Sequence, residues 1–142
     1  MSIENCPFCA YADGRFTSEL IAYEDEHVLV VPSLHQWGPN QGHCLVVTRA
    51  HIRDLYALPD HLAGPMLSTV TAAARAVKAA FSADGVTIRQ NNETAGGQDV
   101  FHIHFHVVPR FHGDRETRPV FAIVDEPTRI AQAQALRTAW PS

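Results

Sequence analysis

The clearest alternation of apolar and polar residues along the chain lies in the segment FHIHFHVV, where every second residue up to position 106 is a histidine. In a β-strand, residues i, i+2 and i+4 lie on one face of the sheet. The β-branched and aromatic residues between the histidines favour a strand over a helix. We therefore predict that His102, His104 and His106 form a row on one face of a strand that ends at Pro109.

Other apolar runs predict an early hairpin and further strands. The segment ELIAYEDEHVLVVPS, residues 19–33, predicts two short strands joined at residues 24–26. Strands are also predicted at His43 to Thr48 and at Val86 to Asn92, and a possible strand at residues 120–124. The segments LHQWGPNQ and TAGGQD are rich in turn-forming residues and predict loops.

The main predicted helix covers residues 58–81, LPDHLAGPMLSTVTAAARAVKAAF, and its second part is rich in alanine. One stripe of this helix can face a sheet, because apolar residues recur at spacings of three and four: Met66, Val70, Ala73, Val77 and Ala80. A shorter helix is predicted from about Pro127 to Ala139. Several strands with one dominant helix predict an α+β fold with a mostly antiparallel sheet.

Length and composition limit the class of protein. A chain of 142 residues predicts a single domain over residues 1–142, and its net charge of −4 argues against a nucleic-acid partner or an anionic membrane surface. The sequence has no run of about 20 apolar residues and no signal-peptide pattern at its N-terminus. Its three cysteines suit a reducing compartment, so we expect a cytoplasmic protein.

The histidine-rich segment can carry chemistry, because imidazole serves as metal ligand, general acid or base, and nucleophile. The preceding Gly96-Gly97 turn could form an anion-binding nest from successive backbone N–H groups. Such a nest beside imidazoles suits a phosphate group, whose oxygens it would hold while one imidazole attacks phosphorus. The alternatives are an ordinary turn and histidines that are merely partnered core or surface residues.

The segment CPFC places two cysteines at the spacing of half a metal site. Cys6 and Cys9 could be unremarkable thiols, a redox pair, or two ligands of a tetrahedral zinc site that needs two more. A redox pair normally follows a strand, and none is predicted there. Cys44 lies inside an apolar strand and is expected in the core, whereas His51 follows that strand and could reach the N-terminal segment.

Three segments resemble the histidine triad superfamily. Asn91 and the following AGGQDVFHIHFHVVPR are similar to its signature, His-φ-His-φ-His-φ-φ after a Gly-Gln turn, where φ is apolar. GHCLVVTRAHI and YEDEHVLVV resemble other strands of that family. The resemblance covers most of the chain up to about Pro109. It implies a homodimer whose subunit has a mostly antiparallel five-stranded sheet and one main helix. The short C-terminal helix predicted above adds to this fold.

The resemblance also implies roles for individual residues. The family cleaves at the α-phosphate of nucleotides through a covalent nucleotidyl-histidine, which makes His104 the nucleophile. His106 would contact the phosphate and assist the leaving group. Substrate-binding positions of the family match Asn91, Gly97, Gln98, Asp99 and His43. Structural zinc, as in many bacterial members, would be bound by Cys6, Cys9, His51 and His102.

We therefore predict a hydrolase or transferase acting on a nucleoside phosphoramidate or a related AMP ester. One departure keeps alternatives open: members that bind nucleosides carry an aspartate at or near the position of His35, and SLHQWGPNQ contains no acidic residue. Trp37 in this segment could stack on a base or anchor the packing. The alternatives are a dinucleoside polyphosphate hydrolase and a non-enzymatic nucleotide-binding or regulatory protein with structural zinc.

Overall fold

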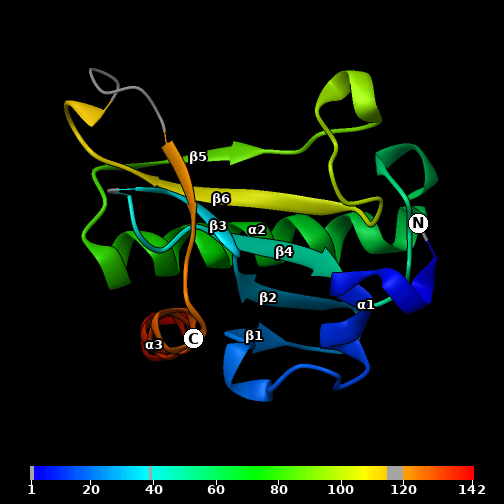
Figure 1. Cartoon of the computed structure of the whole chain (residues 1–142), viewed down its shortest axis with the longest axis horizontal. Coiled ribbons are helices and arrows are strands. Elements are labelled where there is room, and N and C mark those ends of the chain that lie inside the picture. The colour runs from blue at the N-terminus through cyan, green and yellow to red at the C-terminus, as the bar shows by residue number, and fades with distance from the viewer. Residues whose placement is uncertain (1, 39, 115–119) are drawn as a thin grey trace.

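The computed structural model describes residues 2–38, 40–114 and 120–142, and its centre is a five-stranded antiparallel sheet (Figure 1). The strand order is β1-β2-β4-β6-β5, and each neighbouring pair is antiparallel. The bounds are Tyr23–Glu24 for β1, Val28–Pro32 for β2, Cys44–Thr48 for β4, Gly85–Arg89 for β5 and His104–Arg110 for β6. The predicted α+β class and the five-stranded sheet are therefore confirmed.

The central strands β2 and β4 are buried on both faces, which explains why they read as continuous apolar runs. Val30 and Val46 face helix α2, Asp60–Phe81, whose predicted apolar stripe packs into the same core. Leu29 and Leu45 point to the opposite face, where they pack against α1, Pro7–Ala12. Because side chains alternate along β6, His104 and His106 also lie on the face away from α2, opposite Val47 and Leu45 in the register.

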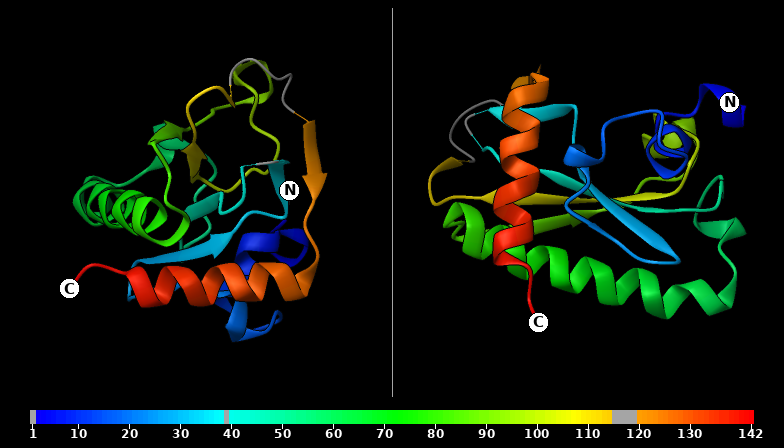
Figure 2. Two further views of the ribbon diagram at one scale, coloured as in Figure 1. Left: turned by 90° about the vertical axis from the view of Figure 1, so that its left-hand side faces the viewer. Right: turned by 90° about the horizontal axis from the view of Figure 1, so that it is seen from below.

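The C-terminal helix α3, Glu126–Ala139, crosses α2 and closes one end of the core (Figure 2). Its Ala133 and Leu136 are fully buried in the cluster that α2 shares with the sheet. The helix begins where the Asp125 side chain accepts the N–H of Thr128 at 2.8 Å, an N-cap that satisfies one free donor of the first turn. None of the described helices is both long and apolar enough to cross a membrane.

The prediction that residues 34–41 form only a loop is wrong for residues 35–38. Strand β3, His35–Gly38, pairs antiparallel with β7, Val120–Ile123, in a second, two-stranded sheet. The Gln36 side chain adds to this pairing, because its Nε2 donates to Gln132 Oε1 of α3 at 2.7 Å. The pairing joins segments far apart in the sequence, so local turn propensity could not reveal it. Pro39 of this segment lies outside the described residues.

The histidine strand begins later than predicted. β6 starts at His104, and His102 lies in a bend whose next residue, Ile103, donates its N–H to Ile52 O at 2.7 Å. The predicted row of three histidines on one strand is therefore wrong for His102. Short 3-10 turns complete the described chain at Ile3–Asn5, Ser18–Leu20, Leu55–Ala57 and Thr94–Gly96.

Gly42 fixes the turn that leads into β4. Its φ is +105°, and a Cβ there would overlap the ring of Phe81 at the end of α2. The turn therefore depends on glycine for its backbone conformation and for space. Gly14 has a similar φ of +81° but has nothing within 4 Å of a Cβ.

Substitutions at these two glycines distinguish backbone strain from steric overlap with a neighbouring side chain. We expect Gly14→Ala to lower the free energy of unfolding by about 1 kcal/mol, because alanine is strained at positive φ. Gly42→Ala should cost roughly 1–3 kcal/mol more, because the methyl group also displaces the Phe81 ring. Urea unfolding followed by circular dichroism measures both. Equal losses in the two variants would contradict a packing role for Gly42.

Candidate functional site

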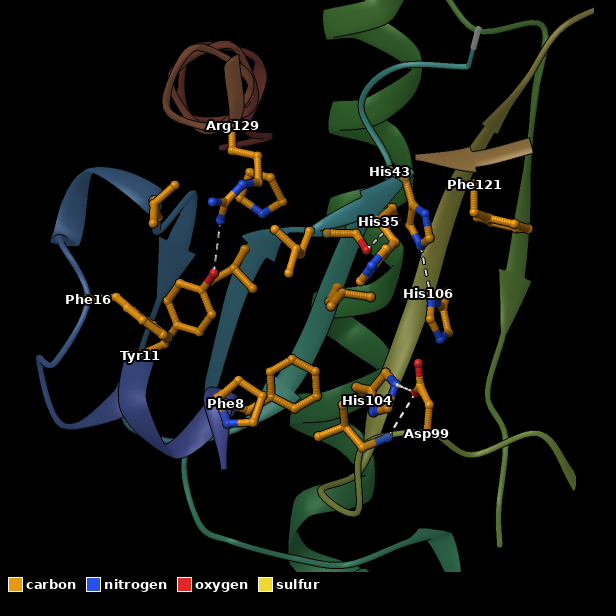
Figure 3. Close-up of a pocket in the computed structure, with 18 of the residues that line it drawn as sticks. Phe8, Tyr11, Phe16, His35, His43, Asp99, His104, His106, Phe121 and Arg129 are labelled. Atoms are coloured by element: carbon orange, nitrogen blue, oxygen red, sulfur yellow. Dashed lines mark hydrogen bonds and ion pairs between the residues drawn. The ribbon is translucent and has the colours of Figure 1, made fainter. Parts of the chain in front are cut away.

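A cavity of about 700 Å³ opens on the face of the sheet away from α2 (Figure 3). Segments from both ends of the chain form its apolar wall: Phe8 and Tyr11 of α1, Leu45 of β4 and Phe121 of β7. His104 and His106 of β6 also line the cavity, and the ring of Phe8 lies 4.9 Å from that of His104. The volume is in the range of small-molecule sites. The sheet thus presents two imidazoles to a largely apolar cavity.

His104 is held with one ring nitrogen free. Its Nδ1 lies 2.7 Å from the carbonyl oxygen of His102, and because a carbonyl only accepts, Nδ1 carries the proton. Nε2 then keeps a lone pair, and the side chain is 4% exposed. Burial, partly offset by this hydrogen bond, lowers the pKa of His104 below its usual value, so the ring is neutral at pH 7. A neutral imidazole with a free lone pair beside a cavity can act as a nucleophile.

His106 and His43 form a hydrogen-bonded pair of rings. His106 Nδ1 lies 2.9 Å from His43 Nε2, and His43 is 1% exposed. The other nitrogen of His43, Nδ1, has no partner among the described residues. An unpaired buried N–H is rarer in proteins than an unpaired acceptor. We therefore assign the proton of His43 to Nε2, which donates to His106, and the proton of His106 to its own Nε2.

Both rings of this pair are neutral at physiological pH. Burial lowers the pKa of His43 to about 3, with smaller contributions from His106, Arg89 and His104. Burial likewise lowers the pKa of His106 to about 3, and the neighbouring His104 acts in the same direction. An Nε2–H of neutral His106 can donate a hydrogen bond or a proton without a permanent positive charge.

Two charged side chains flank the imidazoles. Arg89 of β5 is opposite His106 in the register and lines the cavity, and sequence reasoning missed it because the register of β5 on β6 was unknown. Among the ion pairs of the described residues, none involves Arg89, so its guanidinium is available to an anion. Asp99 also lines the cavity, and its Oδ1 lies 3.7 Å from His104 Nε2.

The loop before β6 is held together internally. Gln98 is buried, and its Nε2 donates to the carbonyl oxygen of Arg53 at 2.7 Å while its Oε1 accepts the N–H of Glu93 at 2.8 Å. Asn91 Nδ2 donates to Gly96 O at 2.7 Å. None of Asn91, Gly97 and Gln98 is among the residues that line the cavity. The side chains of Asn91 and Gln98 therefore shape the loop.

The expected anion-binding nest does not form in this loop. The N–H groups of Gly96, Gly97 and Gln98 each donate to a carbonyl oxygen of Glu93 or Thr94 at 3.0 Å. They are consequently unavailable to a ligand. Gly97 is still required, because its φ is +89° and a Cβ would lie 3.2 Å from Asn91 Nδ2.

The four residues expected to bind metal lie together beside the site: Cys6, Cys9, His51 and His102. Their ligand atoms are all within 4.8 Å of one another. Cys6 Sγ and His102 Nδ1 are 3.3 Å apart, and Cys9 Sγ and His51 Nδ1 are 3.2 Å apart. Sulfur and nitrogen ligands of tetrahedral zinc are about 3.5 Å apart, and two thiolates with two imidazoles are a usual zinc donor set. The cluster therefore fits a zinc ion.

The surroundings support the same assignment. His102 Nε2 donates to the carbonyl oxygen of Thr48 at 2.7 Å, which leaves Nδ1 as the metal-facing nitrogen. Cys6 is the N-cap of α1, and its Sγ accepts the N–H of Cys9 at 3.5 Å, so the start of the helix brings the two sulfurs together. Cys44 lies apart in the core, as predicted.

Sequence reasoning missed most of the cavity wall. Several lining residues come from the N-terminal segment and the tail, for which no functional role was predicted: Phe8, Tyr11, Phe16, Phe121, Glu126 and Arg129. Apart from Phe8, which lies inside the Cys-x-x-C segment, no chemical motif marks them, and only the tertiary fold brings them together. His35 also lines the cavity. Trp37 instead packs beneath the guanidinium of Arg110 at 4.3 Å, so the packing alternative holds for it.

The burial of His43 can be tested through the pH dependence of the free energy of unfolding. An unfolded chain protonates this histidine below about pH 6.5, whereas the folded protein keeps it neutral down to about pH 3. Its burial therefore reduces stability as the pH falls through that window. The His43→Gln variant can still donate to His106 but has no histidine to protonate. Between about pH 7.5 and about pH 5 it should lose up to roughly 2 kcal/mol less unfolding free energy than wild type.

Urea unfolding at the two pH values gives this difference, and contributions common to both proteins cancel. His61→Gln is the matched control, because it removes an exposed histidine of α2 and should leave the pH dependence unchanged. The same pH dependence in wild type and His43→Gln would reject the burial of a neutral ring at this position.

Comparisons with known proteins agree with this geometry. The family described as HIT domain matches residues 17–113. The chain is 39% identical over 108 residues to "Protein hit" of Bacillus subtilis, covering 76% of this chain and 72% of that protein. It is 30% identical over 110 residues to "Adenylylsulfatase HINT3" of Arabidopsis thaliana, covering 78% of this chain and 54% of that protein.

A solved structure, that of a zinc-bound histidine triad family protein from Mycobacterium smegmatis, superposes with a TM-score of 0.81 at 33% identity. The match covers 97% of this chain and 94% of the other. The resemblance noted in the sequence is thereby confirmed, and the chain belongs to the HIT domain, or histidine triad, family.

Proposed function

We propose that this protein is a hydrolase or transferase that acts at the α-phosphate of a nucleoside phosphoramidate or a related AMP ester. The observation that carries the proposal is the His104 ring, whose Nδ1 is bound to a carbonyl and whose Nε2 is free beside the cavity. The name of the Arabidopsis relative, an adenylylsulfatase, supports chemistry at an adenylyl group. The aromatic wall of the cavity, made by Phe8, Tyr11, Phe16 and Phe121, suits a nucleobase, because aromatic rings stack on bases.

The reaction proceeds in two displacements. His104 Nε2 attacks phosphorus and forms a P–N bond while the bond from phosphorus to the leaving group breaks. His106 gives its Nε2 proton to the leaving group, and Arg89 offsets charge on the phosphate oxygens. Water then attacks phosphorus as the P–N bond to His104 breaks, and the water proton passes to His106. The nucleoside monophosphate departs, and His104 Nε2 regains its lone pair. Another acceptor in place of water would give transfer.

The remaining site residues have supporting roles in this proposal. His43 orients the His106 ring, Asn91, Gly97 and Gln98 hold the loop before β6, and Asp99 faces the leaving-group side of the cavity. Cys6, Cys9, His51 and His102 hold a structural zinc ion. The zinc would cross-link the N-terminal helix to the bend before β6. The His102 carbonyl that binds His104 belongs to that same bend.

The assembly and location follow from the family and the composition. We propose that residues 1–142 form one domain, that the protein is a cytoplasmic homodimer, and that its partner is a small-molecule nucleotide or phosphate ester. The outer edge of β5 supports a dimer, since no described strand pairs with it and Ile88 on it is exposed.

Trapping the intermediate tests the proposed chemistry. A slowly hydrolysed adenosine phosphoramidate should leave an adenylyl adduct on the peptide that contains His104, detectable by mass spectrometry. His104→Ala should give no adduct and lose roughly 10³-fold or more in kcat/KM, because the nucleophile is gone. His61→Ala should behave as wild type. Full turnover by His104→Ala would reject the mechanism, and AMP binding without any turnover would favour the non-enzymatic alternative.

Metal content tests the zinc assignment. Protein purified without chelator should contain about one zinc per chain. Cys9→Ser should lose the metal and roughly 3 kcal/mol of unfolding free energy, because binding of metal to the folded state stabilises that state. Cys44→Ala should lose about 1–2 kcal/mol for the buried atom removed and should retain its zinc. Equal zinc in both variants would rule out this ligand set.

A further inference from the structure

Asp99 places a negative charge where the proposed reaction brings in a phosphate. Its carboxylate points toward the imidazoles of β6, between His104 and His106 (Figure 3). The Oδ1 atom is fixed in part by the N–H of Val100, which donates to it at 2.9 Å. The 3.7 Å separation from His104 Nε2 exceeds hydrogen-bond distance, so the carboxylate does not hold the ring.

This arrangement works against anion binding at the reactive end of the cavity. Of the charged residues that line the cavity, Arg89, opposite His106 in the register, and Asp99, 3.7 Å from His104 Nε2, are the two beside the imidazoles. Arg89 can neutralise one phosphate charge. A leaving group with its own negative charge, such as sulfate or a nucleoside phosphate, would add a further negative charge beside the Asp99 carboxylate. A leaving group with a positive charge would instead complete the charge balance.

We propose that Asp99 selects the leaving group, and that the preferred substrates are phosphoramidates whose departing amine carries a positive charge. The inference rests on the proposed function, because it names the leaving group of that same displacement. In the first step, the P–N bond to the amine breaks as His104 bonds to phosphorus, and the amine nitrogen takes the proton of His106. The released amine, with its cationic group, then departs past the Asp99 carboxylate.

Two matched substrates isolate the charge. Both are adenosine 5′-phosphoramidates, one made from ethane-1,2-diamine, which ends in an ammonium group, and one from glycine, which ends in a carboxylate. The ratio of their kcat/KM values is measured for wild type, for Asp99→Asn and for Asp60→Asn. Asn keeps the acceptor for the Val100 N–H. Asp60 is exposed at the start of α2, so Asp60→Asn removes the same charge at a position away from the cavity.

Wild type should prefer the ammonium substrate by roughly 5-fold or more, and raised salt should reduce the preference. Asp99→Asn should bring the ratio close to unity, whereas Asp60→Asn should keep the wild-type ratio. A ratio that is unchanged in Asp99→Asn, with both substrates turned over, would overturn the role of Asp99 and leave the proposed function intact. Absence of both turnover and His104 adduct would overturn the proposed function, and this inference with it.

Discussion

The hydrogen bond from His104 Nδ1 to the carbonyl oxygen of His102 is the interaction on which the site depends. It fixes the tautomer of His104 and directs the lone pair of Nε2 away from the backbone. The carbonyl can sit there because the chain bends at His102 before β6 begins. His102 thus serves twice: its side chain belongs to the Cys₂His₂ cluster, and its backbone carbonyl sets the tautomer of the His104 ring.

The second pair of histidines complements the first through the opposite tautomer. His43 Nε2 donates to His106 Nδ1, so the proton of His106 is on Nε2. In His104 the same atom, Nε2, is unprotonated. One ring can therefore attack and its neighbour can donate, and no proton has to be redistributed before a substrate arrives. Burial keeps the His43 and His106 rings neutral, so the direction of the hydrogen bond between them does not change over the physiological pH range.

Local periodicity in the sequence predicted the elements whose structure is locally determined. The stripe of α2 from Met66 to Val77, the alternation of β6 and the Cys-x-x-C spacing each depend on neighbours within a few residues. The prediction failed where distant segments decide the structure. β3 exists because β7 and Gln132 pair with it, His102 leaves the strand for the cluster with Cys6, and Gln98 turns inward to Arg53. The prediction of an anion-binding nest at the Gly96-Gly97 turn failed for a related reason, because the N–H groups of this turn donate to carbonyl oxygens within the loop.

The residues proposed for reaction and those proposed for recognition come from different parts of the chain. The residues proposed for chemistry, Arg89, His104 and His106, all lie within the segment 17–113 that matches the HIT domain. Much of the aromatic wall lies outside it, with Phe8 before that segment and Phe121 after it. Phe8 connects the two parts, because its ring lies 4.9 Å from that of His104 and it belongs to the helix that also carries Cys9. The metal cluster, by holding that helix to the bend before β6, therefore sets the distance between the surface that would bind a base and the nitrogen that would attack its phosphate.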